Sequence, residues 1–239
     1  MNVAFLTGCA TGTPEQHLTA GGQAFLRGDT ATAIKEYKVA LRLDKRYAPA
    51  HYNLGICYST PKTRDKAVEH FSRAIALDQH YIEAYVGLAQ SYLRKDSLAG
   101  AVEVLQRGLG QGLPPEPFYA NLGYAYLLTA QKDSALSYYR RAIACDSTRA
   151  EYWFNVGYLL TKPEQSGESI ASLRQARRFS AEPASVSYLL GTRLLEKPGR
   201  TRAETAEGIA LLEEYLASGD RDQMKTAKAR EKIAPAARR

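Results

Sequence analysis

The sequence predicts an all-α protein built from stacked pairs of helices. Two observations support this prediction. Short motifs with the same order of aromatic, small and apolar residues recur with a fixed period of about 34 residues, and within each motif the apolar residues recur at helical spacing. The chain of 239 residues is long enough for a substantial core. Because one helix pair cannot bury its apolar face alone, the pairs are expected to stack and share a continuous core.

Each repeating unit contains two motifs, one for each helix. The first motif reads AHYNLGICY, AYVGLAQSY, FYANLGYAY and YWFNVGYLL, starting at Ala50, Ala84, Phe118 and Tyr152. The second motif follows as AVEHFSRAIALD, AVEVLQRGL, ALSYYRRAIACD and SIASLRQARRFS, and AIKEYKVALRLD near the start of the chain belongs to the same series. Small residues let the two helices approach closely, while the larger rings fill the space beside them.

Counting along the chain in steps of this period gives six units and two flanking segments. The units lie near residues 14–47, 48–81, 82–115, 116–149, 150–183 and 184–219. The sixth unit stretches the turn between its helices through EKPGRTRAETAEG, so its second helix is expected about five residues late. Residues 1–13 are interpreted as a signal remnant and tether, and residues 220–239 as a basic capping helix and tail.

The pattern resembles the tetratricopeptide repeat, a helix–turn–helix unit of about 34 residues. The family prefers certain residue types at seven positions of the unit, in the order large residue, Leu, Gly, Tyr, Ala, aromatic residue and Ala. In the second unit these positions are occupied, in the same order, by His51, Leu54, Gly55, Tyr58, Ala67, Phe71 and Ala74. The resemblance covers about residues 14 to 218. It implies a right-handed superhelix, an α-solenoid, of about six units followed by the C-terminal capping helix.

The resemblance also implies a non-enzymatic protein that binds peptide segments or partner proteins in a concave groove. The first helix of each unit would line this groove with Tyr52, Asn53, Ile56, Val86, Gln90, Asn121, Tyr124, Phe154, Asn155, Tyr158 and Tyr188. An asparagine amide can pair with the backbone of an extended peptide through both donor and acceptor, and tyrosine is typical of binding hot spots. Alternatively, these asparagines are solvated or cap a neighbouring turn.

Motifs for catalysis or metal binding are missing from the sequence. His17, His51, His70 and His80 are dispersed, and the glycine-rich GLGQG follows a predicted helix rather than a strand. Cys57 and Cys145 are interpreted as small packing residues. We therefore predict no enzyme activity, no cofactor and no metal. No segment reaches the roughly 18–20 apolar residues of a transmembrane helix.

The net charge of +7 is concentrated at the C-terminus. Residues 221–239 contain seven basic and two acidic side chains, which is +5 and leaves +2 for the rest of the chain. Clustered basic residues attract phosphates and anionic lipids. The tail lacks aromatic residues on which bases would stack, which disfavours nucleic acid as the partner.

The first residues decide the predicted location. Leu6-Thr7-Gly8-Cys9 matches the bacterial lipobox, in which the cysteine becomes lipidated. Only eight residues precede Cys9, without Lys or Arg, whereas a signal needs a basic segment and about 7–15 apolar residues. The favoured interpretation is a lipoprotein whose true start lies upstream of Met1. The alternative is a cytoplasmic protein with a coincidental match.

Three functional hypotheses follow from these observations. The first is a periplasm-facing lipoprotein adaptor of the bacterial envelope, at the outer membrane, that assists the assembly of a membrane or secretion complex. The second is a cytoplasmic scaffold or co-chaperone with the same groove. The third is a regulatory subunit that contacts nucleic acid or anionic lipid through residues 221–239.

Overall fold

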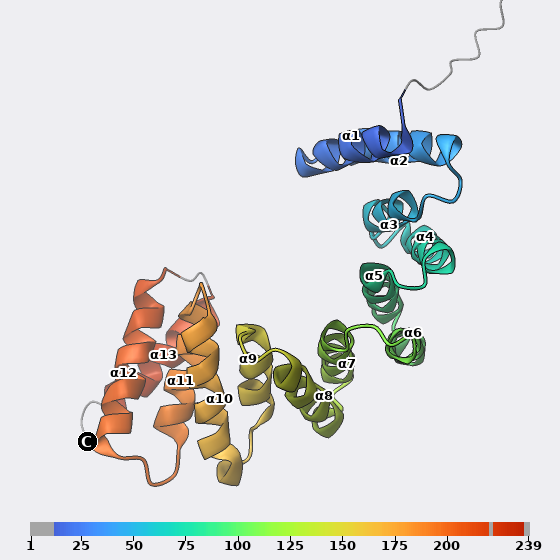
Figure 1. Ribbon diagram of the computed structural model, residues 1–239. Coiled ribbons are helices and arrows are strands. Elements are labelled where there is room, and N and C mark those ends of the chain that lie inside the picture. Colours follow the sequence, from blue (N-terminus) through green and yellow to red (C-terminus); the bar gives the residue numbers. More distant parts are fainter. Residues whose placement is uncertain (1–11, 220–221, 237–239) are drawn as a thin grey trace, which may run out of the picture. The chain divides into compact units, whose positions relative to one another are not determined.

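The computed structural model describes residues 12–219 and 222–236 of the chain (Figure 1). These described residues form thirteen α-helices and one short 3-10 turn, and no β-strand occurs among them. The prediction of an all-α protein is confirmed. No helix in the described part of the chain combines the length and the apolar character needed to cross a membrane.

The chain divides into two compact units, Met1–Asn121 and Leu122–Arg239. The division falls within α7 (Glu116–Leu128), so each unit takes part of this helix.

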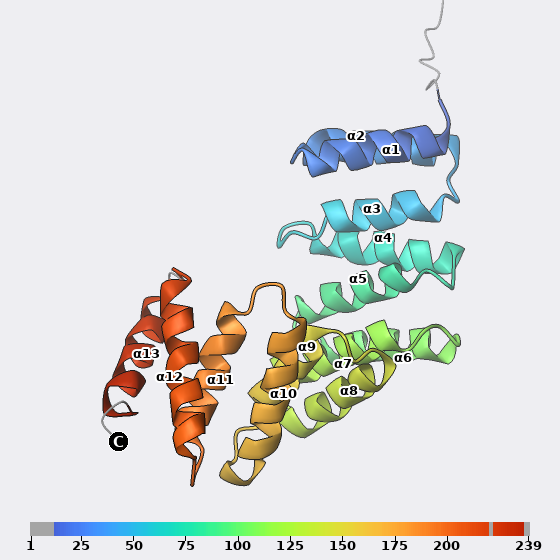
Figure 2. The same ribbon diagram turned by 60° about the vertical axis from the view of Figure 1, so that its left-hand side comes forward.

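In the first unit, consecutive helices pack against each other in sequence order (Figure 2). Its complete helices are α1 (Pro14–Leu26), α2 (Thr30–Leu43), α3 (Ala48–Cys57), α4 (Arg64–Leu77), α5 (Ile82–Leu93) and α6 (Leu98–Gly110). The first helices of the three pairs begin at residues 14, 48 and 82, where the period of the motifs predicts them.

Polar caps fix several of the helix starts. The Thr13 hydroxyl accepts a hydrogen bond from the Gln16 backbone N–H, and the Gln16 side chain accepts one from the Thr13 N–H. Asp29 caps α2 and Ser97 caps α6 in the same way with their side-chain oxygens. Each cap satisfies a backbone N–H that the helix itself leaves unpaired.

A single aromatic ring sets the spacing between α3, α4 and α5. Phe71 of α4 is 2% exposed. A Cβ atom on Gly55 of α3 or on Gly87 of α5 would come within 2.7 Å of this ring. The ring therefore fills the space that two glycines on different helices leave open.

The second unit continues with pairs of helices and ends with an additional one. Its elements after α7 are α8 (Lys132–Cys145), α9 (Ala150–Leu159), the 3-10 turn η1 (Pro163–Gln165), α10 (Ser166–Phe179), α11 (Ala184–Glu196), α12 (Arg202–Ala217) and α13 (Gln223–Ala236). Here too, α9 and α11 begin one period apart, at residues 150 and 184.

The last pair, α11 and α12, has a shifted register. α12 begins at Arg202, two residues later than the spacing between the starts of α3 and α4 predicts. At the packing contacts the shift is larger. Phe71 lies against Gly55 in the second pair, and Leu212 lies against Gly191 in the sixth, five residues beyond the equivalent position. The prediction of a turn that extends through EKPGRTRAETAEG is therefore wrong, because residues 202–208 already belong to α12. The five-residue delay is present only at the contact residues, and the helix itself starts two residues late.

The final helix, α13, packs against both α11 and α12. Ala229, Ile233 and Ala236 join a core cluster that contains Leu195, Leu212 and Tyr215. Next to Ala229, the helix presents the exposed charged side chains of Lys228 and Arg230. The helix has a narrow apolar stripe of mostly small residues, which allows it to lie close to its neighbours.

Candidate functional site

In the first unit, some of the residues assigned to the groove take part in packing between helices. Tyr52 packs against Phe71 and Tyr81, with ring centroids 5.8 and 5.0 Å apart. Burial raises the pKa of the Tyr52 phenol. Asn53, Ile56 and Val86 are half-buried on the first helices α3 and α5.

The asparagines at equivalent positions are in different situations. The Asn121 side chain donates to the Pro117 carbonyl over 2.8 Å and accepts from the Gln90 amide over 3.4 Å. Within the described residues, neither Asn53 nor Asn155 has a side-chain hydrogen bond, and both are half-buried. Two of the three predicted amides are therefore available to a peptide backbone, whereas Asn121 is already engaged.

In the second unit, large aromatic side chains of the predicted set are exposed. Tyr124 on α7 is 45% exposed and Tyr158 on α9 is 51% exposed. Phe154 lies one turn before Tyr158 on the same helix, and the two rings stack with centroids 6.4 Å apart. Exposed aromatic surface of this kind is costly in water and is typical of binding sites.

A cavity of about 440 Å³ lies beside this stack. It is bounded by the start of α9, the end of α10 and the start of α11, and its apolar walls include Phe154, Phe179 and Val186. Phe179 is itself partly exposed. The cavity is of a size that accommodates one or two apolar side chains. Sequence reasoning identified Phe154 but missed Phe179 and Val186, which come from neighbouring elements.

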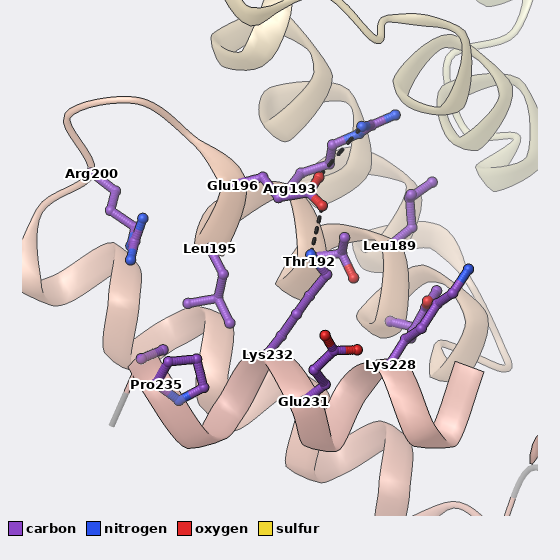
Figure 3. Close-up of a pocket in the computed structure, with 12 residues that line it drawn as sticks. Leu189, Thr192, Arg193, Leu195, Glu196, Arg200, Lys228, Glu231, Lys232 and Pro235 are labelled. Atoms are coloured by element: carbon purple, nitrogen blue, oxygen red, sulfur yellow. Dashed lines mark hydrogen bonds and ion pairs between the residues drawn. The ribbon is translucent and has the colours of Figure 1, made fainter. Parts of the chain in front are cut away.

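Tyr188 lies at a second and larger cavity of about 710 Å³, between α11 and α13 (Figure 3). Its ring packs on Tyr215, with centroids 5.0 Å apart. Residues of α11 that line the cavity include Tyr188, Leu189, Thr192, Leu195 and Glu196. The opposite wall is formed by α13, the helix that follows the last repeat. Sequence reasoning predicted only Tyr188 here.

The second cavity has a predominantly basic lining. Its charged residues are Arg193, Arg200, Lys228 and Lys232, together with Glu196 and Glu231. Glu196 is paired with Lys232 over 2.6 Å and lies 3.8 Å from the Arg193 guanidinium. Among the described residues, Arg200 and Lys228 have no ion-pair partner, so their charges are available to a ligand.

Two of the histidines regarded as dispersed lie together between α3 and α4. The Nδ1 atoms of His51 and His70 are 3.1 Å apart, and the His70 ring stacks on Tyr58. Burial lowers the pKa of both imidazoles below the ordinary value of 6.5, and the charge of His51 lowers that of His70 further. No third ligand completes a metal site there, since no group of three His, Cys, Asp or Glu residues gathers within residues 12–219 and 222–236.

The described cysteines differ from each other. Cys57 is buried, and burial raises the pKa of its thiol to about 11. The prediction of a packing residue is correct for Cys57, which is an unreactive thiol at neutral pH. For Cys145 it is wrong, because this side chain is exposed at the end of α8. The predicted lipidation site, Cys9, lies outside the described residues.

Models of one repeat family match three consecutive segments of the chain. A TPR repeat model matches residues 22–60, and tetratricopeptide repeat models match residues 62–116 and 116–148. No curated protein sequence matched the chain.

Solved structures with the same fold cover nearly the whole chain. PilF of Pseudomonas aeruginosa is 14% identical, with a TM-score of 0.76, over 91% of this chain and 96% of its own. PilW, described as a widely conserved type IV pilus biogenesis factor, is 15% identical, with a TM-score of 0.72, over 90% and 97%. YrrB, described as a TPR protein with an unusual peptide-binding site, is 19% identical, with a TM-score of 0.58, over 82% and 97%. At these identities the likeness concerns the fold alone.

Proposed function

Because this chain belongs to the tetratricopeptide-repeat family, we propose that it is a non-enzymatic scaffold that binds an extended segment of a partner protein. The binding surface is the first-helix face of the second unit. The observation that carries this proposal is the stack of Phe154 and Tyr158 beside the apolar cavity of about 440 Å³.

The surface offers the two kinds of contact that an extended segment needs. An apolar side chain of the partner enters the cavity and covers the exposed rings, which removes apolar area from water. Asn155 follows Phe154 on the same helix, and its amide has both a donor and an acceptor for the partner's backbone. Apolar contacts provide the affinity, and the amide fixes the orientation of the segment.

Binding of degenerate decapeptide pools tests the proposal. In each fluorescently labelled pool one central position is fixed as Leu, Glu, Lys or Gln. We expect the intact chain to bind the Leu pool. The double variant Asn155→Ala/Tyr158→Ala should bind this pool at least about tenfold more weakly, which corresponds to a loss of ~1.4 kcal/mol in binding free energy. Leu43→Ala is the matched control, because Leu43 is an exposed apolar residue on the second helix of a pair. Equal binding by both variants would contradict the proposal.

We further propose that the scaffold works at a bacterial envelope, in the assembly of a membrane or secretion complex. Two observations support this location: the lipobox-like Leu6-Thr7-Gly8-Cys9, and the fold shared with PilW, which is described as a type IV pilus biogenesis factor. The test is labelling with radioactive palmitate in a bacterium that expresses the chain from its genomic reading frame. Label that is lost in Cys9→Ser supports the anchor; an unlabelled protein favours the cytoplasmic scaffold instead.

A further inference from the structure

We infer that the cavity between α11 and α13 binds a carboxylate side chain of the partner segment, next to an apolar residue. This inference rests on the proposed function, since it specifies which chemistry the bound segment carries.

The position of the cavity connects it to the first-helix face. α11 contributes Ser185 and Val186 to the apolar cavity near Phe154, and six residues between Tyr188 and Glu196 to the larger cavity. Figure 3 shows α13 crossing below α11, with Lys228, Glu231 and Lys232 between the two helices. An extended segment that passes along α11 therefore meets both cavities in turn.

The charges that line the larger cavity favour an anion. Its four basic and two acidic residues leave a net charge of +2. The carboxylate of Glu196 is already neutralised by Lys232, at 2.6 Å. Glu231 lies on α13 between Lys228 and Lys232, so basic residues flank its position on both sides. Arg200 and Lys228 lie at opposite ends of the cavity (Figure 3). Neither has an ion-pair partner in the described part of the chain, so each end offers a charge-assisted hydrogen bond to a carboxylate.

The remaining lining explains why an apolar residue accompanies the carboxylate. Tyr188, Leu189, Leu195, Pro235 and Ala236 give the cavity apolar walls.

The decapeptide pools also test this inference. We expect the intact chain to bind the Glu pool at least about tenfold more tightly than the Lys pool, and this preference to decrease with salt. The double variant Arg200→Glu/Lys228→Glu removes or reverses the preference. Arg230→Glu is the matched control, because Arg230 is exposed on α13 and does not line the cavity. In this control the preference for Glu is retained.

Each outcome has a distinct meaning. If no pool binds the intact chain, the proposed function fails together with the inference. If pools bind without a preference for Glu, or if Arg230→Glu loses the preference as fully as the double variant, the inference alone is overturned. Vesicles of phosphatidylglycerol and phosphatidylcholine test the competing ligand. The cavity would be assigned to lipid headgroups instead if two results were obtained together. The intact chain would bind these vesicles without preferring the Glu pool, and the double variant Arg200→Glu/Lys228→Glu would no longer bind the vesicles.

Discussion

The second and sixth helix pairs both pack tightly at a glycine, but different groups lie against that glycine. Between α3 and α4, the Phe71 ring lies over Gly55. Between α11 and α12, backbone meets backbone: a Cβ atom on Gly191 would lie 2.9 Å from the Gly208 carbonyl oxygen. The alignment of the two helices in a pair therefore depends on which residue of the second helix lies against the glycine of the first. In the sixth pair this residue, Leu212, comes five positions later than Phe71 does in the second pair, and the contact with the glycine is kept.

The largest effect is expected from removing the ring in the second pair. Phe71→Ala leaves a cavity between two glycines that cannot fill it, so we expect a loss of about 3–5 kcal/mol in the free energy of unfolding. Urea denaturation followed by circular dichroism measures this loss. Phe25→Ala serves as the control, since Phe25 is 40% exposed and its loss should cost far less. Similar losses in both variants would mean that the ring does not set the spacing.

A smaller effect is expected from adding one methyl group in the sixth pair. Gly191→Ala forces the Gly208 carbonyl away, and overpacking of this kind costs about 1–3 kcal/mol. A methyl group added to Gly167 of α10 would meet no atom within 4 Å, so Gly167→Ala is expected to be neutral or stabilising by up to ~1 kcal/mol. Thermal denaturation of the two variants side by side gives the comparison. A Gly191→Ala protein as stable as wild type would show that α12 can shift without cost.

The smallest effect concerns pH, and it is specific to the second pair. The lowered pKa values of His51 and His70 mean that the unfolded chain binds protons more readily than the folded one. The contribution of the two neutral imidazoles to the stability of the fold is fully present above the ordinary pKa of 6.5. It is lost as the pH falls from there through the lowered pKa values that these histidines have in the folded chain. Between about pH 7.5 and 5, we expect the melting temperature of His70→Gln to fall by roughly 2 °C less than that of wild type.

A matched substitution distinguishes this histidine pair from a general effect of charge. His80 is exposed after α4, and His80→Gln should keep the full pH dependence of the wild type. If His70→Gln and His80→Gln respond equally to acid, the contact between His51 and His70 does not contribute to the pH dependence.

Much of the fold follows from local pattern. Glycines, alanines and rings recur with a fixed period, and helices begin at residues 14, 48, 82, 116, 150 and 184, at the same spacing as the motifs. The same rule placed Phe154 and Tyr158 on the first-helix face, where the exposed stack is found. The contact of His51 with His70 was missed, although both lie in one unit at positions that face each other across its two helices.

The sequence by itself determined the helical class, the repeat family and the positions of the first-helix residues, because each depends on spacing within a single unit. Only the tertiary structure decided how α13 packs against α11, since this helix lies outside the repeat and has no register to count from. The basic cavity therefore could not be derived from Arg200, Lys228 and Lys232 in the sequence. Their side chains come together because α13 packs against α11, and the repeat pattern does not predict how these two helices are placed.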